Sequence, residues 1–375
     1  MILRIEEFKD VCSTILNAID INELSEITET VELVCEGNQL LLNVTNREYY
    51  VRVKLPLQQA EDFHAVVNAN LFLRLVSQLT SETIELTVDN NSLIVKANGK
   101  YKLPLIYVDD KMLSLPVITI KNVTNTFNIP TVILNGIAKY NGKELAKSNF
   151  NFTRPVQRLY YMDENGCITF TSGACVNNFN LPCNVRVLFN QRLVKLFKLF
   201  NTTEVTFSIG YDEISNNVLQ TKVSFITPSV EVTAILSCDD TLLNSVPAQA
   251  IRARANDIYP ESIFINKNDL VQALNRLMLF YAGFGGKKSL KSYFIFKMNE
   301  DVIQITDNSG ENVETIYTVN NSSVKEPYSM IIDVVDIKNV LDVVSEEFIN
   351  LRFGNHTAIV VSRGNVNNVI PECQE

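Results

Sequence analysis

The side chains that most often do chemistry in proteins are sparse in this sequence. The two histidines, His64 and His356, lie in different thirds of the chain, and neither has a Ser, Cys or carboxylate at a spacing that suggests a catalytic triad. The seven cysteines form no C-x-x-C pair and no cluster with histidine, so small buried thiols are a better account of them than zinc ligands. We therefore expect no enzyme, no metal site and no cofactor.

The run Gly283-Phe284-Gly285-Gly286-Lys287-Lys288-Ser289 has some likeness to a nucleotide-binding loop. A phosphate loop, G-x-x-x-x-G-K-[ST], would need Gly at position 281 and Ser or Thr at position 288, where this chain has Tyr and Lys. It would also open a helix, whereas this run follows one. The run therefore predicts a basic loop.

Basic side chains recur at helical spacing in a protein whose net charge is −9. The helix expected over residues 132–148 carries a lysine at every fourth position of one stripe, and the helix expected over residues 190–200 carries three bases and no acid. Such selective use of bases predicts a locally positive surface for nucleic acid, although a solvated helix face is the open alternative. These bases are Lys139, Lys143 and Lys147, then Arg192, Lys195 and Lys198, and in the last third Arg276, Lys287 and Lys288.

Length and composition indicate an ordinary globular protein. A chain of 375 residues with 46% hydrophobic and 20% charged residues is long enough for two or three domains, each with its own core. The N-terminus carries acids where a signal peptide carries bases, and no apolar run approaches the roughly 18–20 residues that span a bilayer. We expect a cytoplasmic location.

One pattern of helices and strands occurs three times along the chain. Its centre is a polar turn, a short alternating strand and a threonine, which are Thr45, Thr171 and Thr306. The expected helices before these strands cover residues 8–19, 132–148 and 267–281, and those after them cover 70–79, 190–200 and 336–345. With Pro116 and Pro247 as punctuation, the repeats predict domains at residues 1–119, 120–248 and 249–375.

The strands that follow the second helix of each repeat alternate between apolar and polar residues. They are expected at residues 83–88, 204–209 and 348–353, each with a further strand at 92–95, 222–226 and 357–361. Strands with one apolar face and amphipathic helices predict an α+β fold in which helices lie on one face of antiparallel sheets.

Several segments are similar to one known family. Residues 24–48, 158–173, 269–276, 339–344 and 369–371 resemble the bacterial DNA polymerase III beta subunit, the DNA sliding clamp. The resemblance spans the whole chain as three tandem clamp-type domains. It implies a closed ring made by a head-to-tail homodimer. Each contact is heterologous, because it joins two different surfaces, and two subunits are enough to complete the ring.

The resemblance also implies partners and sites. The ring would encircle double-stranded DNA without reading its sequence, and it would bind DNA polymerase and a clamp loader. Arg154 and Arg158 become further DNA candidates. The partner-peptide groove would involve Met162, Thr171, Gly173, Val176, Pro247, Ile251, Val369, Ile370 and Pro371. Leu279 and Phe280 would meet the first domain of the other subunit near Tyr101 and Leu103, with packing inside their own domain as the open alternative.

The chain departs from the family pattern in places. It has Ala174-Cys175 where the family often has His-Arg, an acidic tail from Glu372 to Glu375, and Asp20 to Glu23 where a basic loop is common. These departures favour an atypical replication system, for example that of a phage. A clamp that mainly serves transcription or repair partners is one alternative function. A β-rich phage structural protein is another alternative, but the repeated basic helices make it less favoured.

Overall fold

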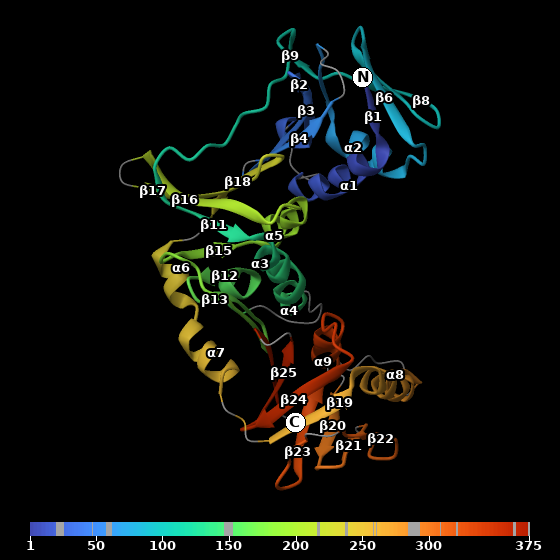
Figure 1. Cartoon of the computed structure of the whole chain (residues 1–375), viewed down its shortest axis with the longest axis vertical. Coiled ribbons are helices and arrows are strands. Elements are labelled where there is room, and N and C mark those ends of the chain that lie inside the picture. Colours follow the sequence, from blue (N-terminus) through green and yellow to red (C-terminus); the bar gives the residue numbers. More distant parts are fainter. Residues whose placement is uncertain are drawn as a thin grey trace. The chain divides into compact units, whose positions relative to one another are not determined.

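The computed structural model describes the chain except residues 20–25, 47, 58–61, 146–152, 216–217, 237–238, 258, 260, 284–292, 308, 320–321, 363–364 and 374–375 (Figure 1). It divides into two compact units, residues 1–135 with 189–238 and residues 136–188 with 239–375. Residues of the predicted middle domain, 120–248, fall in both units. The two predicted boundaries between the three domains therefore remain predictions.

The first unit is built on two sheets, with strand orders β1-β6-β7-β8 and β11-β16-β17-β18-β4-β3-β2-β5, and a β9–β10 hairpin. Its strands are β1 Ile2–Arg4, β2 Thr30–Glu36, β3 Gln39–Thr45, β4 Tyr49–Pro56, β5 His64–Asn68, β6 Thr83–Asp89, β7 Ser92–Lys96, β8 Lys100–Pro104, β9 Tyr107–Val108, β10 Lys111–Met112, β11 Val123–Pro130, β16 Glu204–Ser215, β17 Val218–Ile226 and β18 Val230–Leu236. Its helices are α1 Ile5–Ile15, η1 Leu16–Ala18, η2 Glu26–Glu29, α2 Ala69–Gln78, α3 Thr131–Gly136, whose last residue begins the second unit, α5 Gln191–Leu196 and η5 Phe197–Leu199.

The second unit is also built on two sheets, with strand orders β15-β12-β13-β14-β26-β25-β24-β19 and β22-β21-β20-β23. Its strands are β12 Tyr160–Asp163, β13 Gly166–Phe170, β14 Ala174–Asn178, β15 Arg186–Phe189, β19 Glu261–Asn266, β20 Tyr293–Met298, β21 Val302–Thr306, β22 Val313–Tyr317, β23 Tyr328–Asp333, β24 Phe348–Gly354, β25 Thr357–Ser362 and β26 Val366–Pro371. Its helices are η3 Ile137–Asn141, α4 Gly142–Leu145, η4 Pro155–Arg158, α6 Asp240–Ser245, α7 Ala248–Ala255, α8 Lys267–Gly283 and α9 Val334–Leu341.

The helices bury the stripes that their sequence spacing predicts. In α1, Phe8, Cys12 and Ile15 are buried at positions i, i+4 and i+7, and the Phe8 ring meets Phe72 of α2 with centroids 6.0 Å apart. The Asn68 side chain caps α2 by accepting a hydrogen bond from the backbone N–H of Leu71. The two helices therefore lie side by side over a shared apolar contact (Figure 1).

The threefold pattern is present in the structure. The strands before Thr45, Thr171 and Thr306 are β3, β13 and β21, and each continues into the next strand of its own sheet. The expected helix over residues 267–281 is α8. Asn266 caps it by accepting a hydrogen bond from Asn268 N–H at 2.8 Å, and it ends at Gly283.

The helix expected over residues 132–148 is the main correction. It is helical through Leu145, but a π-helical turn interrupts it at Ile137–Asn141. The buried Asn141 amide donates to the backbone oxygens of Cys167 at 3.3 Å and Cys175 at 3.1 Å, on β13 and β14. A wider turn accommodates a polar side chain that bonds outside its own helix, and spacing alone does not reveal this.

Strands from successive repeats pair in the same way at two places. In the first unit β4 pairs with β18 in antiparallel fashion, and in the second unit β14 pairs with β26. In each case the strand after the threonine of one repeat meets the last strand of the next repeat. The remaining equivalents, β22 and β8, are edge strands of their sheets.

Within the described ranges, no helix is both long and apolar enough to cross a membrane.

Candidate partner groove, basic surface and subunit edges

A cavity of about 360 Å³ in the second unit is the candidate partner groove. Its walls are the β13–β14 connection, the start and one face of α7, the β24–β25 turn and the end of β26. Six of the nine predicted groove residues line it, namely Thr171, Gly173, Pro247, Ile251, Val369 and Pro371. Phe170, Ser172, Ala174, Ala250, Arg254, His356 and Thr357 complete the lining. The surface is mostly apolar with a few polar groups, which suits an extended peptide.

The other three predicted groove residues do not line this cavity. Met162 and Val176 are fully buried and Ile370 is 1% exposed, so their side chains pack in the interior. Strand geometry explains Ile370, because alternate residues of β26 point to opposite faces and Val369 and Pro371 occupy the groove side. Met162 lies on β12, which β13 separates from β14.

The groove floor is anchored by buried polar side chains. The Thr171 hydroxyl donates to the carboxylate of Glu144 on α4, which is only 5% exposed. Gln157 donates from Nε2 to the Thr171 backbone oxygen at 3.4 Å, and its Oε1 accepts from Arg154 N–H at 3.0 Å. The segment that carries Arg154 is therefore bonded to the same residue that lines the groove.

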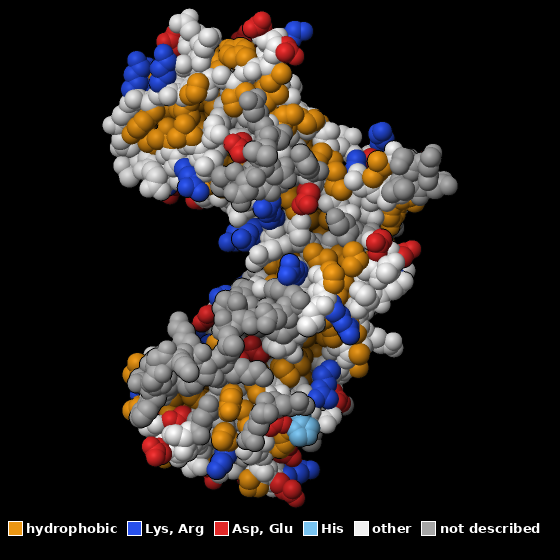
Figure 2. All heavy atoms as spheres, turned by 180° about the vertical axis from the view of Figure 1, so that it is seen from behind, with side chains coloured by type: hydrophobic (Ala, Val, Ile, Leu, Met, Phe, Trp, Pro, Cys, Tyr) orange, Lys and Arg blue, Asp and Glu red, His pale blue; other side chains and the backbone are white. Residues whose placement is uncertain are grey.

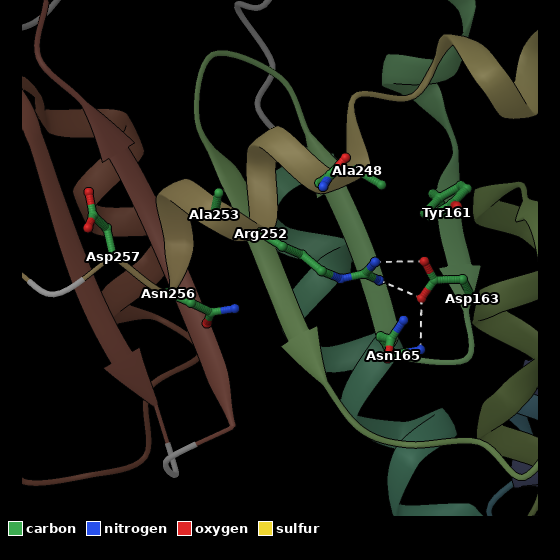
Figure 3. A pocket seen from close by; sticks show the side chains of 9 residues that line it. Tyr161, Asp163, Asn165, Ala248, Arg252, Ala253, Asn256 and Asp257 are labelled. Carbon is green, nitrogen blue, oxygen red and sulfur yellow. Dashed lines mark hydrogen bonds and ion pairs between the residues drawn. The ribbon is translucent and has the colours of Figure 1, made fainter.

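A second cavity, of about 720 Å³, lies against the opposite face of α7 (Figure 3). Its lining is polar and includes Asp163, Asn165, Gln249, Arg252 and Asn256. Arg252 reaches across from α7 and donates to both carboxylate oxygens of Asp163, at 2.6 and 2.5 Å. Such a paired geometry is the stronger form of an ion pair and fixes α7 against β12.

The basic positions predicted in the first unit are where the spacing put them. Arg192, Lys195 and Lys198 are exposed on α5 and η5. The apolar residues between them, Leu193, Val194, Leu196 and Phe197, are buried. Figure 2 shows lysine and arginine side chains in small groups on one face of the molecule. This helix thus combines a core face with a cationic face.

The predicted bases of the second unit differ from one another in their exposure and in their partners. Lys139 is exposed, and its Nζ lies 4.9 Å from the centroid of the Tyr140 ring. Lys143 forms an ion pair with Asp342 of α9 at 3.4 Å. Arg154 and Arg158 are exposed at the two ends of η4. Lys147, Lys287 and Lys288 lie outside the described residues.

Arg276 is exposed, but its charge is already engaged. Its Nε and Nη2 both donate to Glu314 of β22 at 2.7 Å, and this hydrogen bonding lowers the pKa of Glu314 below its ordinary value. Sequence spacing could not reveal this, because the two residues are on different elements. Arg276 is therefore a weaker DNA candidate than the bases of α5.

Comparisons with known proteins agree with this geometry. Residues 1–123 match the family described as DNA polymerase III beta subunit, N-terminal domain. The structure is similar to the DNA polymerase III beta subunit of Thermotoga maritima, with a TM-score of 0.74 and 15% identity over 100% of this chain and 99% of that one. It is also similar to the Bacillus subtilis sliding clamp, with a TM-score of 0.71 and 16% identity over 100% and 98%.

A third similar structure is the Helicobacter pylori beta clamp bound to a DNA ligase peptide, with a TM-score of 0.72 and 12% identity over 100% of both chains. A comparison with curated protein sequences finds no match. The chain has the fold of a DNA polymerase III beta subunit. The resemblance and the α+β clamp fold predicted from the sequence are confirmed.

The beta-clamp fold of this chain leaves apolar side chains exposed where subunits were predicted to meet. Leu279 and Phe280, near the end of α8, are 72% and 50% exposed, so packing inside their own domain is the wrong alternative for them. Tyr101 on β8 is 37% exposed. Leu103 is a correction, because it is only 2% exposed: alternation along β8 turns it into its own core.

Sequence reasoning missed four polar residues of this groove, of which Ser172 lies in the β13–β14 connection. Arg254 and His356 line it together with Thr357, from α7 and the β24–β25 turn. One signal was available for Arg254, since it stands three residues after Ile251 and so shares its helix face. The sequence contains no such signal for His356 and Thr357, because their place in the groove depends on how the β24–β25 turn packs against α7.

Proposed function

We propose that this protein is a DNA sliding clamp, a non-enzymatic processivity factor. Two copies close head to tail around duplex DNA, and the groove of each copy tethers the replicative polymerase, the clamp loader and other partners. An enclosed duplex cannot leave sideways, so tight binding is unnecessary. A few bases that contact phosphates are enough, and they read no sequence.

The observation that carries the proposal is the repeated strand junction. The β4–β18 and β14–β26 pairs join successive repeats within the chain. The same rule applied once more pairs β22, in the last repeat, with β8 of the first repeat, but of a second copy. Both strands are sheet edges in the structure. Edge strands expose unpaired backbone groups, and natural proteins cover or pair them.

The helices follow the same rule. At the two internal junctions α1 contacts α5 and α4 contacts α9. By equivalence the third junction brings α8 of one copy to α2 of the other. The side chains there suit burial, since Leu279 and Phe280 on α8 and Leu71 on α2 are all at least half exposed. Burial of such apolar surface favours a stable subunit contact.

The groove supports the tethering part of the proposal. Its apolar lining and few polar groups suit a short extended peptide, and a tethered partner gains effective concentration at the DNA. The Helicobacter pylori beta clamp, whose structure is similar, was solved bound to a DNA ligase peptide. A clamp that mainly serves transcription or repair partners would use the same groove and differ in the peptides that bind. We expect the protein to act in the cytoplasm.

The ring is tested by the mass of the protein in solution, measured by sedimentation equilibrium. We expect twice the chain mass of 42.3 kDa. Leu279→Asp places a charge in the proposed contact and should reduce the mass to that of one chain. Leu219→Asp is the matched control, because Leu219 is 62% exposed on β17, which belongs to neither the sheet of β8 nor that of β22. A native protein that stays monomeric at high concentration would contradict the proposal, and so would equal effects of the two variants.

A further inference from the structure

The charged or ionisable side chains of the partner groove are few and come from α7 and the β24–β25 turn. Among the described residues that line it, Arg254 is the one with a permanent charge, and His356 lies beside it on the β24–β25 turn. The rest of the lining is apolar or neutral. The groove thus presents a positive group in a protein whose net charge is −9.

Arg254 is held in place by the turn that it faces. Its Nε donates to the Thr357 hydroxyl at 2.8 Å, and its Nη2 donates to that hydroxyl and to the backbone oxygen of Asn355. All of these acceptors are uncharged. In the described part of the chain, Nη1 has no hydrogen-bond partner and no carboxylate pairs with the guanidinium.

Glu372, the carboxylate that contacts His356 on the β24–β25 turn, already has partners for both of its oxygens. One oxygen of Glu372 interacts with the His356 ring, and the other accepts the backbone N–H of Ile331 at 3.2 Å. Arg252 on the opposite face of α7 differs, because both of its Nη atoms donate to the carboxylate of Asp163 (Figure 3). Among the described residues, Arg252 therefore has an anionic partner, and Arg254 has none.

We propose that the groove selects peptides that carry a carboxylate opposite Arg254. This inference rests on the proposed function and adds the chemistry of the ligand. A hydrogen bond between two charged groups is about twice as strong as a neutral one, and the apolar walls reduce its screening. Because the guanidinium is fixed before binding, little ordering is lost when the acid docks. The carboxylate can belong to an Asp or Glu side chain or to a peptide C-terminus.

The test measures the affinity of matched peptides for the full-length protein by fluorescence anisotropy. The probes are blocked hexapeptides of leucine, phenylalanine and glutamine, in which aspartate or asparagine occupies each position in turn. A further set ends in a free carboxylate. We expect one aspartate peptide, or the free-ended set, to bind on the order of tenfold more tightly than its neutral counterpart. The difference should shrink as salt is raised.

Arg254→Gln should abolish this difference, so that each aspartate peptide binds the variant as tightly as its asparagine counterpart, whatever affinity the two then share. Arg352→Gln is the matched control, because Arg352 is exposed on β24 and does not line the groove. Equal binding of aspartate and asparagine peptides at every position would overturn the inference and leave the groove intact. If no peptide binds in either series, the proposed groove itself fails. If Arg254→Gln and Arg352→Gln reduced the preference for aspartate peptides equally, the inference would also be overturned.

Discussion

Thr171 connects the groove surface to the interior of the second unit. Its hydroxyl is the donor to the buried carboxylate of Glu144, and its backbone oxygen accepts from Gln157. A buried carboxylate that loses a donor keeps its desolvation cost without the compensating bond. The role of Thr171 is therefore to support the groove as well as to line it.

Thr171→Val should lower the free energy of unfolding of the second unit by about 1–3 kcal/mol, because it keeps the shape of the side chain and removes the hydroxyl. Urea denaturation followed by tyrosine fluorescence measures this. Thr171→Ser retains the donor and should recover most of the loss. If serine and valine were equally damaging, the methyl group, not the hydrogen bond, would be what matters.

At the residue scale, sequence reasoning identified side chains whose role depends on local spacing. The bases and the apolar residues of α5 separate onto two faces as predicted, since 3.6-residue periodicity fixes both. The engagement of Arg276 by Glu314 and the place of His356 in the groove lining could not be predicted. Both depend on which elements pack together, and the spacing of residues in a single sequence does not show which distant elements are in contact.

Helix α7 is the element on which the groove depends most. It runs between the two cavities, and among its residues Ala255 alone is buried. Polar contacts hold it instead, through Arg252 to Asp163 on one face and Arg254 to the β24–β25 turn on the other. Its position is therefore set by a small number of side chains.

Asp163→Asn should loosen α7, because it leaves the Arg252 guanidinium, 17% exposed, without its charged partner. Hydrogen exchange of the α7 amides should become on the order of tenfold faster, while exchange in α9 is unchanged. Glu314→Gln is the control: it breaks a pair of similar geometry whose arginine is 54% exposed, and such surface pairs contribute little. Unchanged exchange in α7 would show that the ion pair does not position this helix.

The elements themselves were largely predictable. Alternating strands such as β6 and β24 and periodic helices such as α8 lie where the patterns put them. The π-helical turn at residues 137–141 was not, because it follows from the Asn141 side chain bonding to β13 and β14. The strand junctions between repeats were also missed, since pairing of distant strands leaves no local pattern.

At the scale of the whole molecule, the distribution of charge matters more than its sum. A net charge of −9 opposes adhesion to nucleic acid, whereas bases gathered on α5 allow loose phosphate contacts. A ring with this layout would hold DNA by enclosure and slide on it. Retention should therefore depend on the ends of the DNA and only weakly on salt.

The direct measurement uses linear duplex DNA whose ends can be blocked by streptavidin bound to terminal biotin. When the protein is added first and the ends are blocked afterwards, we expect it to stay on the DNA in 0.5 M salt, at which exposed phosphate contacts are largely screened. It should be released when a restriction enzyme cuts the duplex. Protein added after the ends are blocked should not be retained. Retention that ignores the order of addition, or that is lost in salt despite blocked ends, would contradict enclosure of DNA by a closed ring.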